Sequence, residues 1–272
     1  MNLIEVENLS ISNSITGEFI VENLSFHIKK NTCLGIVGES GSGKSMSMKA
    51  ILGLLPSSLK TTGCVRFGDI EMIAAKQETL RKIRSKHICL ILQDAMTAFD
   101  PLSTMGEQII ETFCENMNYT SCEAKEVTLE VLKKMMIHDP LLIMQSYPHQ
   151  LSGGMLHRCM IGLAMALKPE VIIADEPTTG LDSINQRNVL AEFKRLREEG
   201  MTLIFISHDL GVVRYLADDV LVMRHGQCIE YGEAAQVFTN PNHSYSKYLI
   251  DTRKSLTKVF AELINKGAAT SC

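Results

Sequence analysis

The fold is decided by the stretch Cys33-Leu34-Gly35-Ile36-Val37-Gly38-Glu39-Ser40-Gly41-Ser42-Gly43-Lys44-Ser45. Its first five residues are a continuous apolar run, which is typical of a buried strand in a parallel sheet. The residues after the glycines predict a helix over Lys44–Leu55, because Pro56 disfavours helical geometry in the residue before it. A glycine-rich loop between a buried strand and a helix is the context that a phosphate-binding loop requires. The alternative is a chance glycine-rich turn.

The glycine-rich loop is the predicted ATP-binding segment. Its glycines let backbone N–H groups turn inward around phosphate oxygens, and the helix that follows adds the partial positive charge of its N-terminus. Lys44 should neutralise the β- and γ-phosphates, and the Ser45 hydroxyl should be a ligand of Mg²⁺. The residues expected to contact ATP are Gly38, Glu39, Ser40, Gly41, Ser42, Gly43, Lys44, Ser45 and Met46.

A second buried strand, Val171–Asp175, ends in two carboxylates. In an open parallel sheet, ligands bind at the carboxyl ends of the strands, so Asp175 should lie beside the phosphates. We expect Asp175 to assist in holding Mg²⁺. Glu176 should lie beyond the metal and orient or deprotonate the attacking water as a catalytic base. The alternative is a pair of acidic residues that merely ends a strand.

Two further polar residues follow predicted strands. Gln93 comes after His87–Leu92, and its amide is expected to contact Mg²⁺ or the attacking water. His208 comes after Thr202–Ser207 and is expected to reach the γ-phosphate from the side opposite Lys44. Taken alone, a glutamine at a strand end and a single histidine are more often structural, and their order in the chain is what supports a catalytic role.

A second segment with phosphate-binding character is Leu151-Ser152-Gly153-Gly154-Met155. The Ser152 hydroxyl, the N–H groups of the two glycines and the dipole of the following helix would together bind an anion. We expect this segment to lie on a separate lobe and to cap the nucleotide of a partner in a head-to-tail dimer. Asp182 is expected at that interface, although a carboxylate that caps the next helix is an equally good interpretation.

Composition favours a globular chain and disfavours two classes of function. The 272 residues are 45% hydrophobic and 21% charged, which is ordinary for a protein with a sizeable core. A net charge of −4 argues against a nucleic-acid partner held by a basic surface.

No apolar run reaches the roughly 18–20 residues that span a bilayer. The acidic start Met1–Glu7 does not resemble a signal peptide, so we expect a cytoplasmic chain. The eight cysteines contain no C-x-x-C pair, which favours buried thiols over a metal site.

The order of predicted elements places the chain in the α/β class. Leu3–Leu9 and Val21–Ile28 alternate apolar and polar residues as strands do. From about Thr104 to Leu167 the periodicity becomes helical, which we interpret as an inserted helical subdomain. Strands and helices then alternate again, which implies a mostly parallel sheet. Residues His243–Lys266 predict a helical extension.

The chain resembles the ATP-binding-cassette transporter ATPases, whose motifs occur in the same order. The matching positions are Gly38–Ser45, Gln93, Leu151–Met155, Val171–Glu176, the turn ending at Asp182, and His208. The resemblance implies a RecA-like P-loop core with an antiparallel β subdomain and an inserted α-helical subdomain at about residues 95–167. These would occupy residues 1–240, and a C-terminal helical extension would occupy residues 241–272. Family members bind ATP with Mg²⁺ and work as two-cassette sandwiches on transmembrane subunits.

A narrower resemblance is to the ATPase subunits of importers for dipeptides, oligopeptides and nickel. It rests on Ala98–Pro101, Ser146–Met155, Ile173–Thr179 and Asn240–Tyr245. The residues after the glycines of Leu151–Met155, together with Ala217–Val220, are most similar to D-type subunits of nickel or metallophore importers.

This resemblance implies partners and a cargo. The partners would be a second, related but different ABC ATPase subunit, two transmembrane permease subunits and an extracytoplasmic substrate-binding protein, with this chain at the cytoplasmic face of the membrane. Gln93 and Phe99–Ser103 would transmit movement to a permease. The cargo would be nickel or a metal chelate, or alternatively a dipeptide or oligopeptide. An exporter ATPase and a non-transport ATPase of DNA repair or translation are competing interpretations of the same motifs.

The sequence departs from the family pattern at several positions. Met155 and His157 replace glutamines that are usual in family members. The aromatic residue that often stacks on adenine is not obvious, since Ile15 is near the expected position and Phe19 is close to it. Only Cys272 lies beyond Cys228, so the iron–sulfur cluster of some peptide importers is not expected.

Overall fold

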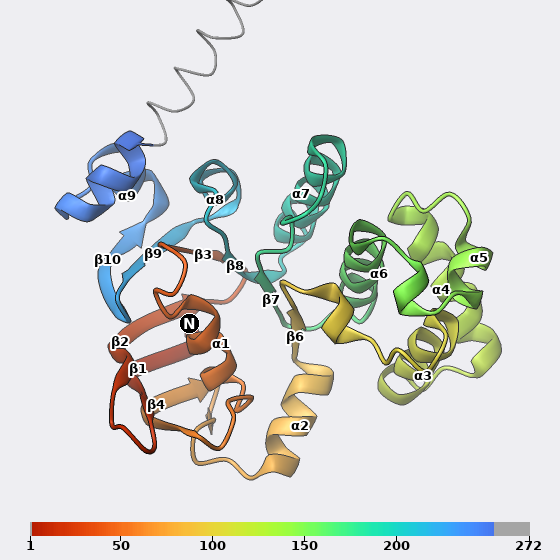
Figure 1. Ribbon diagram of the computed structural model, residues 1–272, viewed down its shortest axis with the longest axis horizontal. Helices are drawn as coiled ribbons and strands as arrows, with labels where there is room; N and C mark the ends of the chain where they lie inside the picture. The colour runs from red at the N-terminus through yellow and green to blue at the C-terminus, as the bar shows by residue number, and fades with distance from the viewer. Residues whose placement is uncertain (1, 253–272) are drawn as a thin grey trace, which may run out of the picture.

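A six-stranded sheet forms the centre of the computed structural model, which describes residues 2–252 (Figure 1). Its strand order is β10-β9-β3-β8-β7-β6, and all neighbouring strands are parallel except β10 and β9, which are antiparallel. The strands are β3 (Cys33–Val37), β6 (Ile88–Ile91), β7 (Val171–Asp175), β8 (Thr202–Ile206), β9 (Asp219–Arg224) and β10 (Gln227–Glu233). The predicted α/β class with a mostly parallel sheet is confirmed. Strands β3, β7 and β8 are buried along their whole length, which explains their continuous apolar sequences.

A second, antiparallel sheet lies on one side of the central sheet and has the order β2-β1-β4-β5. Its strands are β1 (Asn2–Asn13), β2 (Phe19–Lys29), β4 (Leu59–Phe67) and β5 (Ile70–Glu71). Side chains such as Ile4 and Leu24 pack in one buried cluster with Ile36 of β3 and Ile204 of β8. Helices α1 (Lys44–Ile51) and α2 (Gln77–Lys86) contribute to the same cluster. This arrangement holds the start of α1 against the end of β3.

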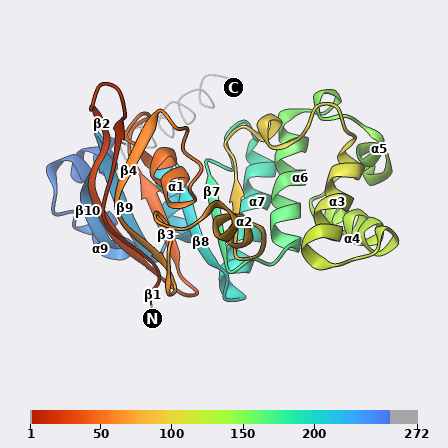
Figure 2. The ribbon, with the colours of Figure 1, turned by 90° about the horizontal axis from the view of Figure 1, so that it is seen from below.

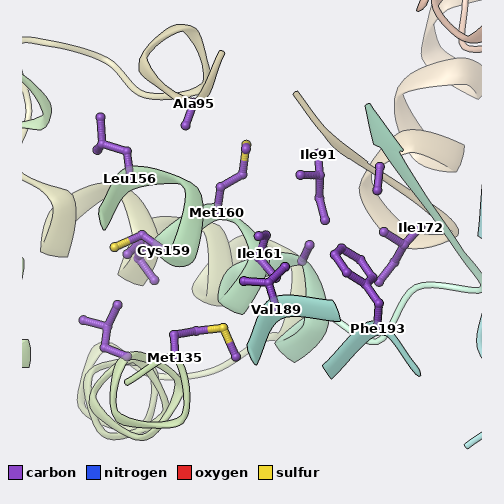
Figure 3. Close-up of a cluster of buried hydrophobic side chains, with 14 of the residues drawn as sticks. Ile91, Ala95, Met135, Leu156, Cys159, Met160, Ile161, Ile172, Val189 and Phe193 are labelled. Carbon is purple, nitrogen blue, oxygen red and sulfur yellow. The ribbon is translucent and has the colours of Figure 1, made fainter. Parts of the chain in front are cut away.

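A helical lobe, residues 95–166, lies on the other side of the central sheet in both Figure 1 and Figure 2. It consists of η1 (Ala95–Ala98), α3 (Met105–Met117), α4 (Ser121–Lys134), α5 (Pro140–Gln145), η2 (Pro148–Gln150) and α6 (Gly153–Ala166). Figure 3 shows how α6 joins this lobe to the sheet, with Ile161 between Met135 of the lobe and Ile172 of β7, and with Met160 on the side of α6 that faces Ala95. The lobe and the sheet therefore share one apolar cluster.

Three helices complete the fold on the C-terminal side. They are α7 (Ser183–Glu198), α8 (Leu210–Leu216) and α9 (Ala234–Thr239). Residues 244–252 are helical as well, which agrees with the first part of the predicted extension. The rest of that extension, including Cys272, lies outside the described residues. None of the helices within residues 2–252 has the length and apolar character needed to cross a bilayer.

The structure corrects one predicted boundary. The first helix ends at Ile51 instead of Leu55, because Gly53 takes a left-handed conformation with φ of 63°. The N–H of Gly53 donates to the Ala50 carbonyl and the N–H of Leu54 to the Lys49 carbonyl, which together close the helix in a Schellman motif. The glycine, not Pro56, ends this helix.

Residues 59–86, for which the sequence predicts no element, form β4, β5 and α2.

Candidate functional site

The glycine-rich loop lies between the end of β3 and the start of α1, as predicted. Gly38 has φ of 154°, and a Cβ built on it would lie 2.2 Å from the carbonyl oxygen of Met223 at the end of β9. Only glycine fits there, since both the backbone conformation and the close approach exclude a side chain. The central sheet therefore fixes the first residue of the loop directly.

Lys44 begins α1 and turns its ammonium group back into the loop. Its Nζ donates to the carbonyl oxygens of Gly38, at 2.9 Å, and Glu39, at 2.8 Å. The side chain is buried, and this burial lowers the pKa of Lys44, while the carboxylates of Glu176 and Asp175 act in the opposite direction. Phosphate oxygens would compete with these carbonyls for the same ammonium group, because a charged acceptor forms a stronger hydrogen bond than a neutral one.

Ser45 and Asp175 meet although they are far apart in sequence. The Ser45 hydroxyl donates to Oδ1 of Asp175 at 3.0 Å. Burial raises the pKa of Asp175, and this hydrogen bond partly offsets the rise. A hydroxyl and a carboxylate are hard oxygen donors of the kind that Mg²⁺ prefers, so this pair fits the expected metal. Among the described residues, no group of three or more His, Cys, Asp or Glu side chains could hold a metal alone.

Glu176, directly after β7, is the point on which the predicted catalytic residues converge. Its Oε2 lies 3.2 Å from Nε2 of Gln93 and 3.1 Å from Nδ1 of His208. Its backbone has φ of 46°, a conformation that non-glycine residues rarely adopt and that is enriched at functional sites. The Glu176 side chain is 16% exposed and the His208 side chain 63% exposed. The histidine is therefore the more solvent-accessible partner of this contact.

Thr179 is a further partner of Glu176 that sequence reasoning missed. Its hydroxyl donates to the same Oε2 at 3.1 Å. The contact arises because residues after β7 form a turn, in which the Thr179 N–H donates to the Glu176 carbonyl at 3.1 Å. A threonine three residues after a carboxylate was the available signal, since that spacing suits a hydroxyl-to-carboxylate contact in a turn.

Leu151–Met155 lies at the start of α6, on the helical lobe. The Ser152 side chain caps this helix by accepting from the Met155 N–H at 3.3 Å. Ser152 and Gly153 are exposed, and a Cβ at Gly153 would meet nothing within 4 Å. The two ribbon views place α6 and α1 on different sides of β6 and β7 (Figures 1 and 2). The structure thus brings six predicted residues together at the carboxyl ends of the central strands: Lys44, Ser45, Gln93, Asp175, Glu176 and His208. It keeps Leu151–Met155 apart from α1.

His157 of α6 links the two groups of residues. Its Nε2 lies 2.9 Å from the Gln93 carbonyl oxygen, and its Nδ1 lies 3.1 Å from the Gly153 carbonyl oxygen. The residue is buried. The sequence showed only that a histidine stands where family members have glutamine. It gave no sign of a contact between positions 64 residues apart in the chain.

Asp182 occupies the position before α7 and caps this helix. Its carboxylate accepts from the N–H groups of Ile184, at 3.1 Å, and Asn185, at 3.0 Å. The bonds from Asn185 are the main reason that the pKa of Asp182 lies below its ordinary value. Asp182 therefore caps α7, which was the alternative interpretation of this residue. Its role at a dimer interface stays a prediction.

Comparison with known proteins gives a consistent picture. The sequence pattern of the ABC transporter family matches residues 21–179. The chain is 42% identical to the metal-staphylopine import system ATP-binding protein CntD of Staphylococcus aureus, over 97% of this chain and 98% of that protein. It is 37% identical to the dipeptide transport ATP-binding protein DppD of Lactococcus lactis, over 97% of this chain and 77% of that protein.

Two solved structures resemble the fold. The dimeric ATP-binding cassette MJ0796 bound to ADP and Pi superposes with a TM-score of 0.76 at 27% identity, over 85% of this chain and 98% of that chain. The protein cbiO1 from Clostridium perfringens, part of the ABC transporter complex cbiONQ, gives a TM-score of 0.72 at 25% identity, over 100% of this chain and 99% of that chain.

Proposed function

The chain belongs to the ATP-binding-cassette transporter family as an ATPase subunit of an importer, and from this premise we propose that it powers the uptake of nickel or a metal chelate. The observation that carries the proposed catalytic site is the convergence of Gln93, Thr179 and His208 on the Glu176 carboxylate. This carboxylate lies directly after Asp175, which contacts Ser45 of the phosphate loop. The proposed base, a candidate metal ligand and the phosphate-binding loop thus lie together at the carboxyl ends of the central strands.

The residues have distinct roles in the proposed hydrolysis of ATP. The loop at Gly38–Ser45, with Met46 beside it, binds the triphosphate, and Lys44 exchanges its carbonyl partners for phosphate oxygens. Ser45, Asp175 and Gln93 would hold Mg²⁺, which neutralises charge on the phosphates. Glu176 orients the attacking water and accepts its proton. His208 and Gln93 fix the direction of the carboxylate and contact the γ-phosphate side of the site.

The family works through dimerisation and through membrane permease subunits. We infer that Ser152, Gly153 and Gly154 bind the nucleotide of a second ATPase subunit, because Ser152 and Gly153 are exposed and Gly154 is half-buried at the start of α6. Asp182 would lie at the same interface. The second subunit is proposed to be a related but different chain. An extracytoplasmic substrate-binding protein would complete the importer, with this chain attached to the cytoplasmic face of the membrane.

Coupling to a permease is proposed through Gln93 and Phe99–Ser103. Phe99 is buried in the apolar cluster that joins the helical lobe to the sheet, whereas Leu102 is 85% exposed. The side chain of Gln108 donates to the carbonyl oxygens of Asp100, at 2.9 Å, and Ser103, at 3.0 Å, which holds the segment against α3. A rigid segment with an exposed leucine suits contact with a membrane subunit. Movement of the lobe would then reach the permease.

The cargo is proposed from similarity and not from this chain's own site. The relative named for metal-staphylopine import matches at 42% identity over nearly its full length. The relatives named for dipeptide and oligopeptide transport match at 37% over 77–79% of their length. The first is the better match, which favours a metal chelate. Deletion of the gene should reduce uptake of radioactive nickel under metal limitation, and unchanged metal uptake with lost dipeptide uptake would favour the peptide alternative.

The catalytic proposal is tested by Glu176→Gln in the assembled transporter. The variant should bind ATP as the unaltered protein does and lose nearly all turnover, because an amide cannot accept the proton of water. Glu170→Gln is the matched control, since Glu170 is the residue before β7, at the end of that strand opposite to Glu176. Turnover should be unchanged in this control. Persistent ATP hydrolysis in Glu176→Gln would show that another group is the base.

A further inference from the structure

The segment after α9 folds back on the end of the sheet where the phosphate loop begins. Glu230 of β10 anchors it by accepting from the N–H groups of Asn242, at 2.8 Å, and His243, at 3.2 Å. Burial alone would raise the pKa of Glu230, but the neighbouring Ser246 hydroxyl and these two N–H groups hold it below its ordinary value. The carboxylate is therefore charged at neutral pH and fixes the start of the final described helix.

Tyr245 of this helix is 4% exposed and belongs to an apolar cluster that includes Val37. Val37 is the residue before Gly38, so the tyrosine ring packs close to the start of the phosphate loop. The guanidinium carbon of Arg224, at the end of β9, lies 4.5 Å from the centre of the ring. This cation–π contact and the apolar cluster fix the ring in place.

The Tyr245 hydroxyl is buried beside Glu39 of the phosphate loop. It makes no hydrogen bond of ordinary geometry. Burial raises the pKa of this hydroxyl and the neighbouring Glu39 carboxylate raises it further, whereas the Glu39 main chain and the Arg224 guanidinium act in the opposite direction. From the other direction, the Glu39 carbonyl accepts from Nζ of Lys44. Glu39 therefore lies between the lysine that would bind phosphate and a buried donor that lacks a partner.

We propose that Tyr245 is a positioning residue for ATP, whose hydroxyl donates to the Glu39 carboxylate and holds the outer side of the phosphate loop when Lys44 turns to the phosphates. The inference rests on the proposed ATP site. When Lys44 leaves the Glu39 carbonyl, that residue loses its inner partner. The tyrosine then keeps the Glu39 carboxylate away from the triphosphate, where like charges would repel.

Tyr245→Phe tests this proposal, with Tyr248→Phe as the matched control. Tyr248 is on the same helix and is 61% exposed. In the assembled transporter, Tyr245→Phe should raise the KM for ATP about tenfold, the effect of one hydrogen bond to a charged group. The kcat at saturating ATP should stay within about twofold, as expected when a residue acts on binding. The Tm of the full chain should not fall, because the variant removes a buried hydroxyl that has no partner.

A double-mutant cycle with Glu39→Gln identifies the partner. If the hydroxyl acts through this carboxylate, the double variant should have a KM no higher than the worse single variant. An unchanged KM in Tyr245→Phe overturns the inference, and so does a lower Tm together with a lower kcat, which indicates a packing role. Effects that multiply in the cycle overturn the assignment of Glu39. Failure of the unaltered protein to bind ATP would instead contradict the proposed function.

Discussion

Glu176 has a rare backbone conformation, and one oxygen of its carboxylate, Oε2, contacts three polar side chains. The donors Gln93 and Thr179 are neutral, so they orient the carboxylate without pairing it with a fixed charge. Gln93 donates through its amide nitrogen, which leaves its oxygen as the atom that a cation would contact. The same glutamine would therefore contact both the proposed base and the proposed metal. Its main chain is tied to α6 by His157.

This link leads to a prediction for His157. His157→Ala should lower the free energy of unfolding by about 0.5–1.5 kcal/mol, because the hydrogen bond between the buried His157 side chain and the Gln93 carbonyl is lost. It should also lower ATP turnover, since Gln93 is no longer held to α6. His157→Gln restores a donor and should recover most of the turnover. Denaturant unfolding and steady-state hydrolysis by the assembled transporter measure both effects.

His138→Ala is the control for this prediction, because His138 is an exposed residue of the same lobe. Neither its stability nor its turnover should change measurably. If His157→Ala keeps full turnover, the contact with the Gln93 carbonyl has only a packing role.

Residues of the site differ in how far the sequence predicts them. Lys44, Asp175 and Glu176 follow strands whose apolar runs are visible, and a strand end in a parallel sheet is enough to place them. Thr179 and His157 depend on a turn and on a contact between helix and loop, and neither has a periodic signal. His208 was expected at the γ-phosphate, and in the structure it contacts Glu176.

At the scale of elements, α1 shows how one glycine fixes the length of a helix. Gly53 ends α1 and packs so closely that a Cβ would lie 2.6 Å from Cδ1 of Leu80 in α2. Gly53 was visible in the sequence as a possible helix end. The prediction placed the end at Pro56 instead, because proline is incompatible with a helix interior whereas glycine only weakens it. The strands were predicted better, since a buried strand has a continuous apolar run. Short or irregular strands such as β5 have no such run, because two residues cannot show a period.

Gly53→Ala should therefore destabilise the protein by about 1–2 kcal/mol from the left-handed backbone alone. Overlap with Leu80 should add to this cost. Gly68→Ala separates the two effects, because Gly68 has a similar φ of 56° and a Cβ there would meet nothing within 4 Å. Thermal and denaturant unfolding of both variants give the difference. Equal destabilisation would mean that Leu80 moves aside without cost.

At the scale of the whole molecule, two lobes share one apolar cluster but present different functional surfaces. The phosphate loop, Asp175 and Glu176 lie at the edge of the central sheet, and Ser152 lies on the helical lobe beyond β6 (Figures 1 and 2). The sequence predicted this separation because the helical region interrupts the alternation of strands and helices. It could not predict how α6 packs, since packing against β6 and β7 depends on contacts between distant residues. This arrangement suits a chain that contributes complementary halves to two nucleotide sites.

The central claim is that Lys44 serves this chain's own nucleotide and Ser152 serves that of a partner. The most direct test compares Lys44→Ala with Ser152→Arg in two measurements, ATP binding by the isolated chain at a concentration where it is monomeric and ATP turnover by the assembled transporter. We predict that Lys44→Ala abolishes both, whereas Ser152→Arg leaves binding by the monomer unchanged and abolishes turnover by the complex. If Ser152→Arg weakens ATP binding by the monomer as strongly as Lys44→Ala does, both residues act on one nucleotide within one chain and the account is wrong.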